Sequence, residues 1–114
     1  MKSLLPLCLA AAVAGFALPV ASATNNTAIE GAVAELGSIH GTALACKQPA
    51  LVSRARNAVQ TTAPKTRAYG EIFENATSEA FLAQGRAACP DAQRLASQLA
   101  EAESKLGDSV RNAQ

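Results

Sequence analysis

His40 is the only histidine in this 114-residue chain, so it is the side chain best suited to proton transfer near neutral pH. A catalytic histidine needs a nucleophile or an acid held against it. Ser38 and Thr42 are its nearest hydroxyl neighbours, but on a helix they would project from other faces. The sequence also has no glycine-rich phosphate loop and no His-x-x-x-His pair. We therefore predict no catalytic residue and expect that the chain is not an enzyme.

Metal and cofactor chemistry has equally little support in the residue types. Cys8 lies in an apolar N-terminal run, which leaves Cys46, Cys89 and His40 as ligands. These three fall short of the ligand set of a structural zinc site. The Cys-x-x-Cys-His run of covalent haem attachment is absent. Soft copper sites also use methionine, and the only methionine is Met1. We predict no metal site and no cofactor.

Residues 1–23 have the pattern of a secretory signal peptide. A positive start with Lys2 precedes the apolar run from Leu4 to Val20, and Ala21-Ser22-Ala23 is a small-x-small cleavage pattern. The alternative is a transmembrane anchor, but a span needs about 20 apolar residues, and this run is shorter and holds two prolines. We predict a cleaved signal peptide (1–23) and one helical domain (24–114), periplasmic or secreted from a bacterium, with no stable membrane insertion afterwards.

A disulfide is the chemistry that we expect of Cys46 and Cys89. An exported chain meets an oxidising compartment, where two thiols commonly pair. A domain this small and rich in alanine also has little core and would benefit from a covalent link. Free thiols, a redox pair and metal ligation are the alternatives. We predict a structural disulfide.

The elements that position these residues follow from helical spacing of the apolar side chains. Proline, glycine and capping residues punctuate the pattern, and no segment alternates for long enough to predict a strand. Gly107 is expected to end the last regular helix. The sequence therefore predicts an all-α fold, a four-helix antiparallel bundle or an orthogonal helical pack with one disulfide. The expected helices cover about 28–46, 49–62, 65–84 and 90–106.

The third helix carries every aromatic side chain of the domain: Tyr69, Phe73 and Phe81. We therefore expect it to supply the bulky half of the core. A break in this helix near Thr77 is an alternative, because Thr77 and the serine after it cap helices well.

Two features of the first helix concern its packing. Gly37, Gly41 and Ala45 recur at a spacing that stacks them on one face, which predicts a close helix crossing. A groove or partner surface is the alternative. His40 lies on the apolar stripe, so we expect a buried neutral imidazole bonded to Tyr69 or to a backbone carbonyl. The alternative for His40 is a pH-sensitive switch.

Charge is balanced overall but uneven along the chain. The sequence has 10 Lys+Arg and 9 Asp+Glu, so removal of Lys2 with the signal peptide gives zero net charge. That balance argues against a nucleic-acid or anionic-membrane binder. From Lys47 to Arg67 there are five cations and no acid. We predict that four of them form a patch that binds an acidic protein partner, and the alternative is a solvated face. The four are Arg54, Arg56, Lys65 and Arg67.

These observations predict a protein-binding module of the cell envelope. An immunity or inhibitor protein and an accessory subunit of an envelope system are the candidates within that class. The alternative is a stress- or acid-responsive holdase chaperone, which would expose apolar surface when His40 and the carboxylates are protonated. A small enzyme is the third candidate, and it would need turnover that depends on His40.

Overall fold

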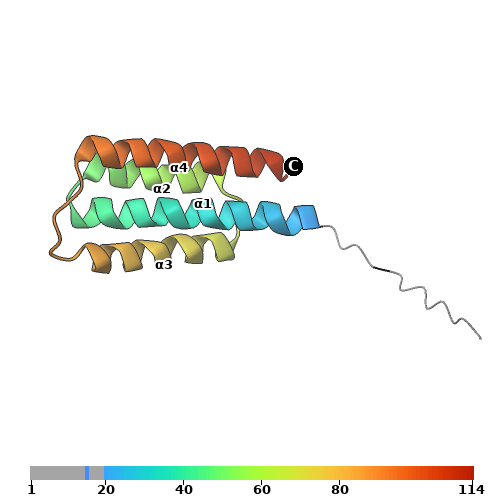
Figure 1. The fold of residues 1–114 in the computed structure, drawn as a ribbon, viewed down its shortest axis with the longest axis horizontal. Helices are drawn as coiled ribbons and strands as arrows, with labels where there is room; N and C mark the ends of the chain where they lie inside the picture. The colour runs from blue at the N-terminus through green and yellow to red at the C-terminus, as the bar shows by residue number, and fades with distance from the viewer. Residues whose placement is uncertain (1–14, 16–19) are drawn as a thin grey trace, which may run out of the picture.

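Four α-helices make up the part of the chain that the computed structural model describes, residues 15 and 20–114 (Figure 1). They are α1 (Val20–Ala45), α2 (Pro49–Thr62), α3 (Arg67–Gln84) and α4 (Ala92–Asn112). The described residues contain no strand, so the all-α prediction is confirmed. The predicted signal peptide lies outside the described residues except at its last positions.

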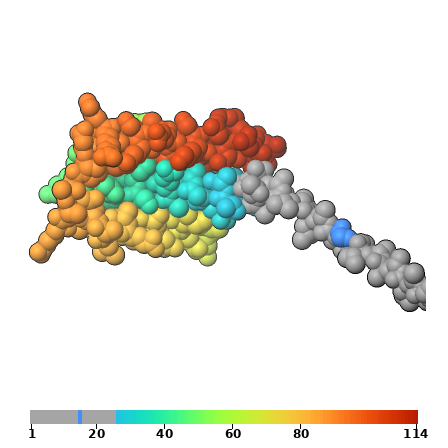
Figure 2. All heavy atoms as spheres, in the orientation of Figure 1, coloured from blue at the N-terminus to red at the C-terminus, as the bar shows by residue number. Residues whose placement is uncertain are grey.

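The helix α1 is the centre of the fold. It packs against each of the other three helices, and α2 also packs against α4, whereas α3 packs extensively on α1 alone. Successive helices run in opposite directions along one common axis, which is the bundle rather than the orthogonal pack (Figure 1). In Figure 2, α1 is visible as a band between α4 and α3. The fold is therefore a three-helix core of α1, α2 and α4 with α3 attached along one side of α1.

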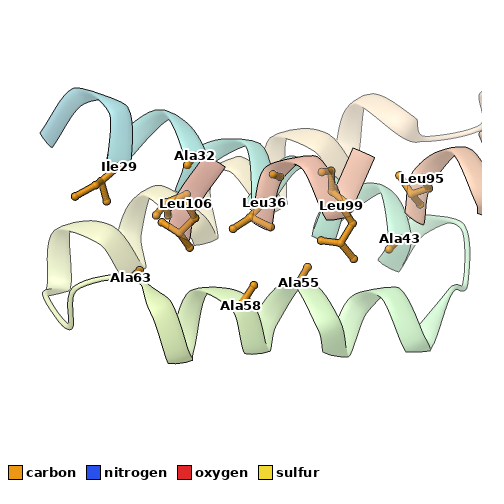
Figure 3. Packing of buried hydrophobic residues seen from close by; sticks show 13 residues of the cluster. Ile29, Ala32, Leu36, Ala43, Ala55, Ala58, Ala63, Leu95, Leu99 and Leu106 are labelled. Atoms are coloured by element: carbon orange, nitrogen blue, oxygen red, sulfur yellow. The ribbon is translucent and has the colours of Figure 1, made fainter. Parts of the chain in front are cut away.

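The hydrophobic core lies between α1, α2 and α4 (Figure 3). Leucine, isoleucine and valine of α1 and α4 fill it, and α2 contributes small side chains that let the three helices approach. The largest fully buried side chains are Ile29, Val33, Leu36, Leu95, Leu99 and Leu106. Alanines from α2 and the turn after it face them: Ala55, Ala58 and Ala63.

The prediction that the third helix supplies the bulky half of the core is wrong. Ala76 is the buried residue of α3, whereas Tyr69 and Phe73 are half-buried and Phe81 is exposed. The physical reason is the shape of the α1–α3 contact. Small side chains of α3 meet glycines of α1, so the aromatic rings lie beside the contact instead of within it.

Gly37 and Gly41 make that contact close. A Cβ atom on Gly37 would lie 2.6 Å from the Phe73 carbonyl oxygen and 2.7 Å from the Ala76 Cβ. A Cβ on Gly41 would overlap the Thr77 carbonyl and lie 2.9 Å from the Ala80 Cβ. Real Cβ atoms do not approach other atoms so closely, so only glycine fits at either position. The predicted close crossing is confirmed.

The prediction that Gly107 ends the last helix is wrong, because α4 continues to Asn112. A glycine inside a helix costs about 1 kcal/mol relative to alanine. Val110 packs against the core beyond it, and Arg111 pairs with Asp108 across the same turn. Burial of apolar surface past the glycine offsets its cost.

The other helix boundaries differ less from expectation. The helix α1 begins at Val20, earlier than predicted, and α3 begins at Arg67 because the Thr66 hydroxyl accepts a hydrogen bond from the Tyr69 N–H at 3.4 Å. Helix α3 does not break near Thr77, whose hydroxyl donates to the Phe73 carbonyl within the helix at 2.8 Å.

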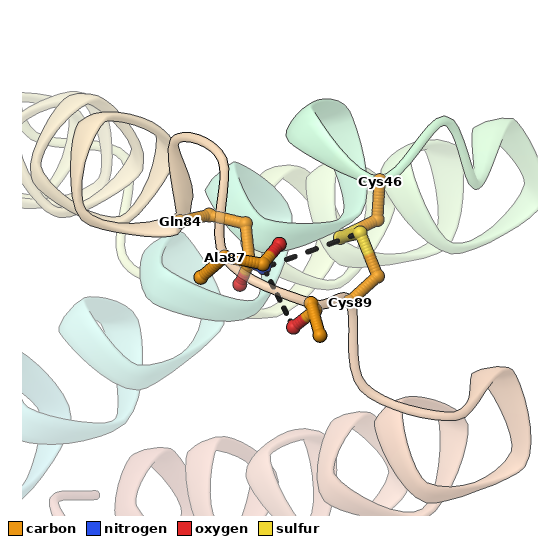
Figure 4. The surroundings of a disulfide bond; sticks show 5 residues. Cys46, Gln84, Ala87 and Cys89 are labelled. Carbon is orange, nitrogen blue, oxygen red and sulfur yellow. Dashed lines mark hydrogen bonds between the residues drawn. A yellow bond between two sulfur atoms is a disulfide. The ribbon is translucent and has the colours of Figure 1, made fainter.

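A disulfide joins Cys46 and Cys89, as predicted, with 5.8 Å between the two Cα atoms. It links the end of α1 to the segment that leads into α4 (Figure 4). The Gln84 side-chain amide donates to the carbonyls of Ala87 and Ala88, each at 3.1 Å. The connection between α3 and α4 is therefore held both covalently and by the last residue of α3.

We expect loss of the disulfide to destabilise the fold substantially. In the chain-entropy model, a bridge across a sequence separation of 43 contributes about 4 kcal/mol. Cys46→Ala/Cys89→Ala, or reduction of the native protein, should lower the melting temperature by many degrees, measured by circular dichroism. An unchanged melting temperature after complete reduction would contradict this.

Substitutions of glycine by alanine should have opposite effects at two positions of α1. Gly41→Ala should destabilise by about 1–3 kcal/mol, because the new methyl group overlaps α3. Gly31→Ala is the matched control: no atom lies within 4 Å of its Cβ position, and alanine should stabilise the helix by up to about 1 kcal/mol. Urea denaturation measures both, and equal effects would mean that the crossing tolerates a side chain.

Candidate functional site

A groove runs between α2 and α3, with α1 as its floor. It exists because α2 and α3 both pack on α1 but, among the described helices, make no extensive contact with each other. We call it the α2–α3 groove. Its central cavity has a volume of about 550 Å³. This cavity is lined by His40, Arg56, Val59, Gln60, Gly70, Phe73, Glu74, Thr77 and Ser78.

The groove continues from the central cavity in both directions. A cavity of about 370 Å³ shares Val59, Gln60 and Gly70 with it and extends to Lys65 in the turn before α3. A cavity of about 350 Å³ shares Thr77 and Ser78 with it and extends toward the disulfide end. That second extension is lined by Leu44, Phe81 and Leu82. No residue of α2 lines this second extension, whereas α3 lines all three cavities, so the groove follows α3, whose 18 residues span roughly 27 Å.

His40 lies at the floor of the groove with 5% of its surface exposed. Its Nδ1 is 3.1 Å from the Thr77 Oγ1. The Thr77 hydroxyl donates its single proton to a carbonyl, with Phe73 O at 2.8 Å nearer than Gly37 O at 3.2 Å. The His40 Nδ1–H therefore donates to Thr77, and Nε2 carries the lone pair. The prediction that His40 is buried against the third helix is confirmed, and its hydrogen-bond partner there is Thr77 instead of Tyr69.

The Nε2 atom of His40 is buried, and no donor among the described residues reaches it. The two ring nitrogens point in different directions, so the hydrogen bond of Nδ1 to Thr77 does not serve Nε2. A buried acceptor without a donor costs about 1–3 kcal/mol. On its other side the ring contacts Phe73, with 4.8 Å between ring centroids. The floor of the groove thus contains a buried ring nitrogen whose missing hydrogen bond lowers the stability of the fold.

Burial lowers the pKa of His40 below its ordinary value of 6.5, and the positive charge of Arg56 lowers this pKa further. Arg56 faces His40 from α2, and Glu74 of α3 lines the same cavity. No residue of α4 lines this cavity. Both effects lower the pKa of His40 and so favour the neutral imidazole over the charged form.

The four predicted patch residues do not all lie on one surface of the molecule. Arg54 pairs with Glu103 of α4 at 2.5 Å, on the side away from the groove. Arg56 and Lys65 line the groove. Arg67 is the exposed first residue of α3. The structure therefore brings Arg56 and Lys65 to one surface and directs Arg54 elsewhere.

The sequence reasoning missed Thr77 and Glu74 as parts of the site. The residue type of Thr77 predicts a helix cap, yet Thr77 lies one helical turn after Phe73 and so shares the helix face of Phe73. That spacing was the available signal for its place at the crossing. Glu74 gave no signal of its own, because its position depends on how α3 is rotated against α1.

Other kinds of site have no support in the described part of the chain. No three His, Cys, Asp or Glu side chains there lie close enough to hold a metal ion. None of the helices described is long and apolar enough to cross a membrane.

Comparison with known proteins found no relative, so a function has to be argued from the groove itself. No protein-family model matches the chain, and no similar curated protein or solved structure was found. The charges, the apolar side chains and the buried histidine of the groove are the features from which a function can be argued.

Acid should destabilise the fold through His40. Its pKa in the folded chain is below 6.5, so the unfolded chain binds the proton more tightly. The contribution of His40 to stability is therefore complete above pH 6.5 and is lost as the pH falls from 6.5 through the folded pKa. His40→Gln separates this effect from that of the carboxylates. The free energy of unfolding should fall less steeply with acid in this variant, and parallel curves for the two proteins would contradict the assignment.

Proposed function

We propose that the chain is a small exported binding protein of the bacterial envelope whose α2–α3 groove receives an acidic segment of a protein partner. The observation that carries the proposal is the charge of the groove. Arg56 and Lys65 line it, and Glu74 is the one carboxylate that lines its central cavity. Within the described residues, neither Arg56 nor Lys65 forms an ion pair.

The chemistry of Arg56 suits a carboxylate ligand. A guanidinium group can donate two parallel hydrogen bonds to one carboxylate, which gives both orientation and strength. Val59 and Phe73 line the same cavity, so a ligand held by Arg56 would also be partly shielded from water. Such shielding strengthens a charge pair relative to one on an open surface.

The turn end of the groove adds further positive potential. The first turn of α3 contains no acidic residue. The partial positive charge of its N-terminus therefore adds to the charges of Lys65 and Arg67. An acidic segment that reached Arg56 along the groove would meet this potential first, which favours fast association.

The hydrogen bonds of His40 support binding rather than catalysis. A general base must accept the proton of its nucleophile. Here the Thr77 hydroxyl donates to backbone carbonyls, and the imidazole donates to Thr77. This direction does not activate the hydroxyl. We therefore assign His40 and Thr77 a structural role at the α1–α3 crossing and propose that the chain is not an enzyme.

A second candidate is an acid-responsive holdase, and one observation favours it. Helix α3 packs extensively only on α1, and His40 lies within that contact. Protonation of a buried imidazole beside Arg56 would weaken the contact and expose the apolar sides of α1 and α3. Binding of a hydrophobic dye on acidification, absent from His40→Gln, would support this candidate over the first.

Removal of the groove cations should weaken capture of the partner. A photo-crosslinker at Gln60, which lines the groove, should capture a protein in envelope extract. We expect capture to slow between about 0.1 M and 1 M salt, because the screening length falls from about 10 Å to about 3 Å. Arg56→Ser/Lys65→Ser should reduce capture about tenfold.

The matched control is Arg86→Ser/Arg94→Ser, which removes the same charge. Arg94 borders a different cavity, between α4 and the end of α3, and Arg86 lies in the loop after α3. The control should capture normally and should remain as helical as the native chain. Equal capture by both double variants would mean that the groove charges are only solvated.

A further inference from the structure

We infer that the partner segment is an amphipathic helix that lies along the α2–α3 groove, with acidic side chains toward the Pro64 turn and apolar side chains toward the disulfide. This inference rests on the proposed function and adds the form and orientation of the ligand. It follows from the length of the groove and from the different side chains at its two ends.

The shape of the groove suits a helix. Helix α3 forms one wall along the whole groove, and α2 forms the other wall at the central cavity and at the turn end. The length of the groove matches the 18 residues of α3, roughly 27 Å. A helix laid against α1 between α2 and α3 would pack as the bundle helices already do. This is the helix-in-groove mode, in which one apolar face is buried and its flanks meet the rims.

The acidic end is assigned from charge. Lys65 borders the cavity at the turn, and Arg56 borders the central cavity beside it. Glu74 lines the same central cavity from α3 but not the cavity at the turn, so its charge favours a carboxylate on the turn side of Arg56. Acidic side chains of the partner are therefore best placed between Arg56 and the turn.

The apolar end is assigned from exposure. Leu44, Phe81 and Leu82 are the large apolar side chains exposed in the described chain, at 39%, 47% and 76%. They line a single cavity that continues from the central one. Exposed apolar side chains that lie together are a common feature of interaction surfaces. Lys47 lies beyond Leu44 in a neighbouring cavity, outside the patch.

The test uses the full chain and a synthetic helical peptide of about 18 residues, with glutamates at one end and leucines at the other. A spin label at the acidic end should broaden the amide signals of Lys65 and Gly70. A label at the apolar end should broaden those of Leu44 and Leu82. A version with glutamine in place of glutamate should bind about tenfold more weakly.

Variants of the apolar end separate this inference from the proposed function. Phe81→Ser/Leu82→Ser should weaken peptide binding about tenfold, and Leu82→Met should retain it. Both side chains are substantially exposed, so their replacement should leave the fold intact, as checked by circular dichroism. Arg86→Ser/Arg94→Ser again serves as the charge control.

Four outcomes would overturn the inference. The first is binding that depends on Arg56 and Lys65 but not on Phe81 and Leu82, which leaves the proposed function intact. The second is equal binding of a proline-containing, non-helical peptide of the same composition. The third is a dimer of the chain that Leu82→Ser dissociates, because the patch would then belong to a second copy. The fourth is no saturable binding up to about 1 mM, or none that depends on glutamate, which would overturn the proposed function as well.

Discussion

The close crossing of α1 and α3 at Gly37 and Gly41 determines much of the rest of the structure. Without side chains at these positions, the backbone of α3 approaches α1 until Cβ atoms of Ala76 and Ala80 nearly touch the glycines. Such an approach leaves no room for aromatic rings within the contact. The rings of Tyr69 and Phe73 therefore lie beside it, next to α2. The groove and its aromatic wall are consequences of two missing side chains.

The same crossing divides the stability of the molecule unevenly. The buried leucines belong to α1 and α4, and α3 adds little large apolar surface to that core. Helix α3 is held by the glycine contact, by the Thr77 hydrogen bonds and by the loop tied to the disulfide. Elements with few large buried side chains open at lower free energy than the core. The wall of the groove is thus the element best able to adjust to a ligand.

Sequence patterns predicted those features of the fold that depend on local spacing. Helical periodicity located α2 closely, and the number of cysteines, together with the expectation of export, predicted the Cys46–Cys89 bond. The predictions that differed from the structure concern features that depend on tertiary contacts. The continuation of α4 past Gly107 requires Val110 to pack on the core. The partner of His40 depends on how α3 is rotated against α1, and periodicity places several residues of α3 equally well.

The candidate site shows a second limit of prediction from the sequence. The acid-free stretch around the Pro64 turn predicts one patch that includes both Arg54 and Arg56, yet residues two apart on a helix do not share a face. Applied to α2, that rule alone would have separated them. It could not have shown that Arg54 has an acidic partner on α4 while Arg56 faces the groove, because this depends on the packing of α2 on the core.

Several features that form the groove also lower the stability of this fold. Larger residues at Gly37 and Gly41 would overlap the backbone of α3, so the close crossing beside the groove depends on glycine at both positions. The chain has glycines that cost helix stability, a buried imidazole with an unpartnered nitrogen and exposed leucines. Costs of this kind are typical of binding surfaces, where local stability is sacrificed for an open site.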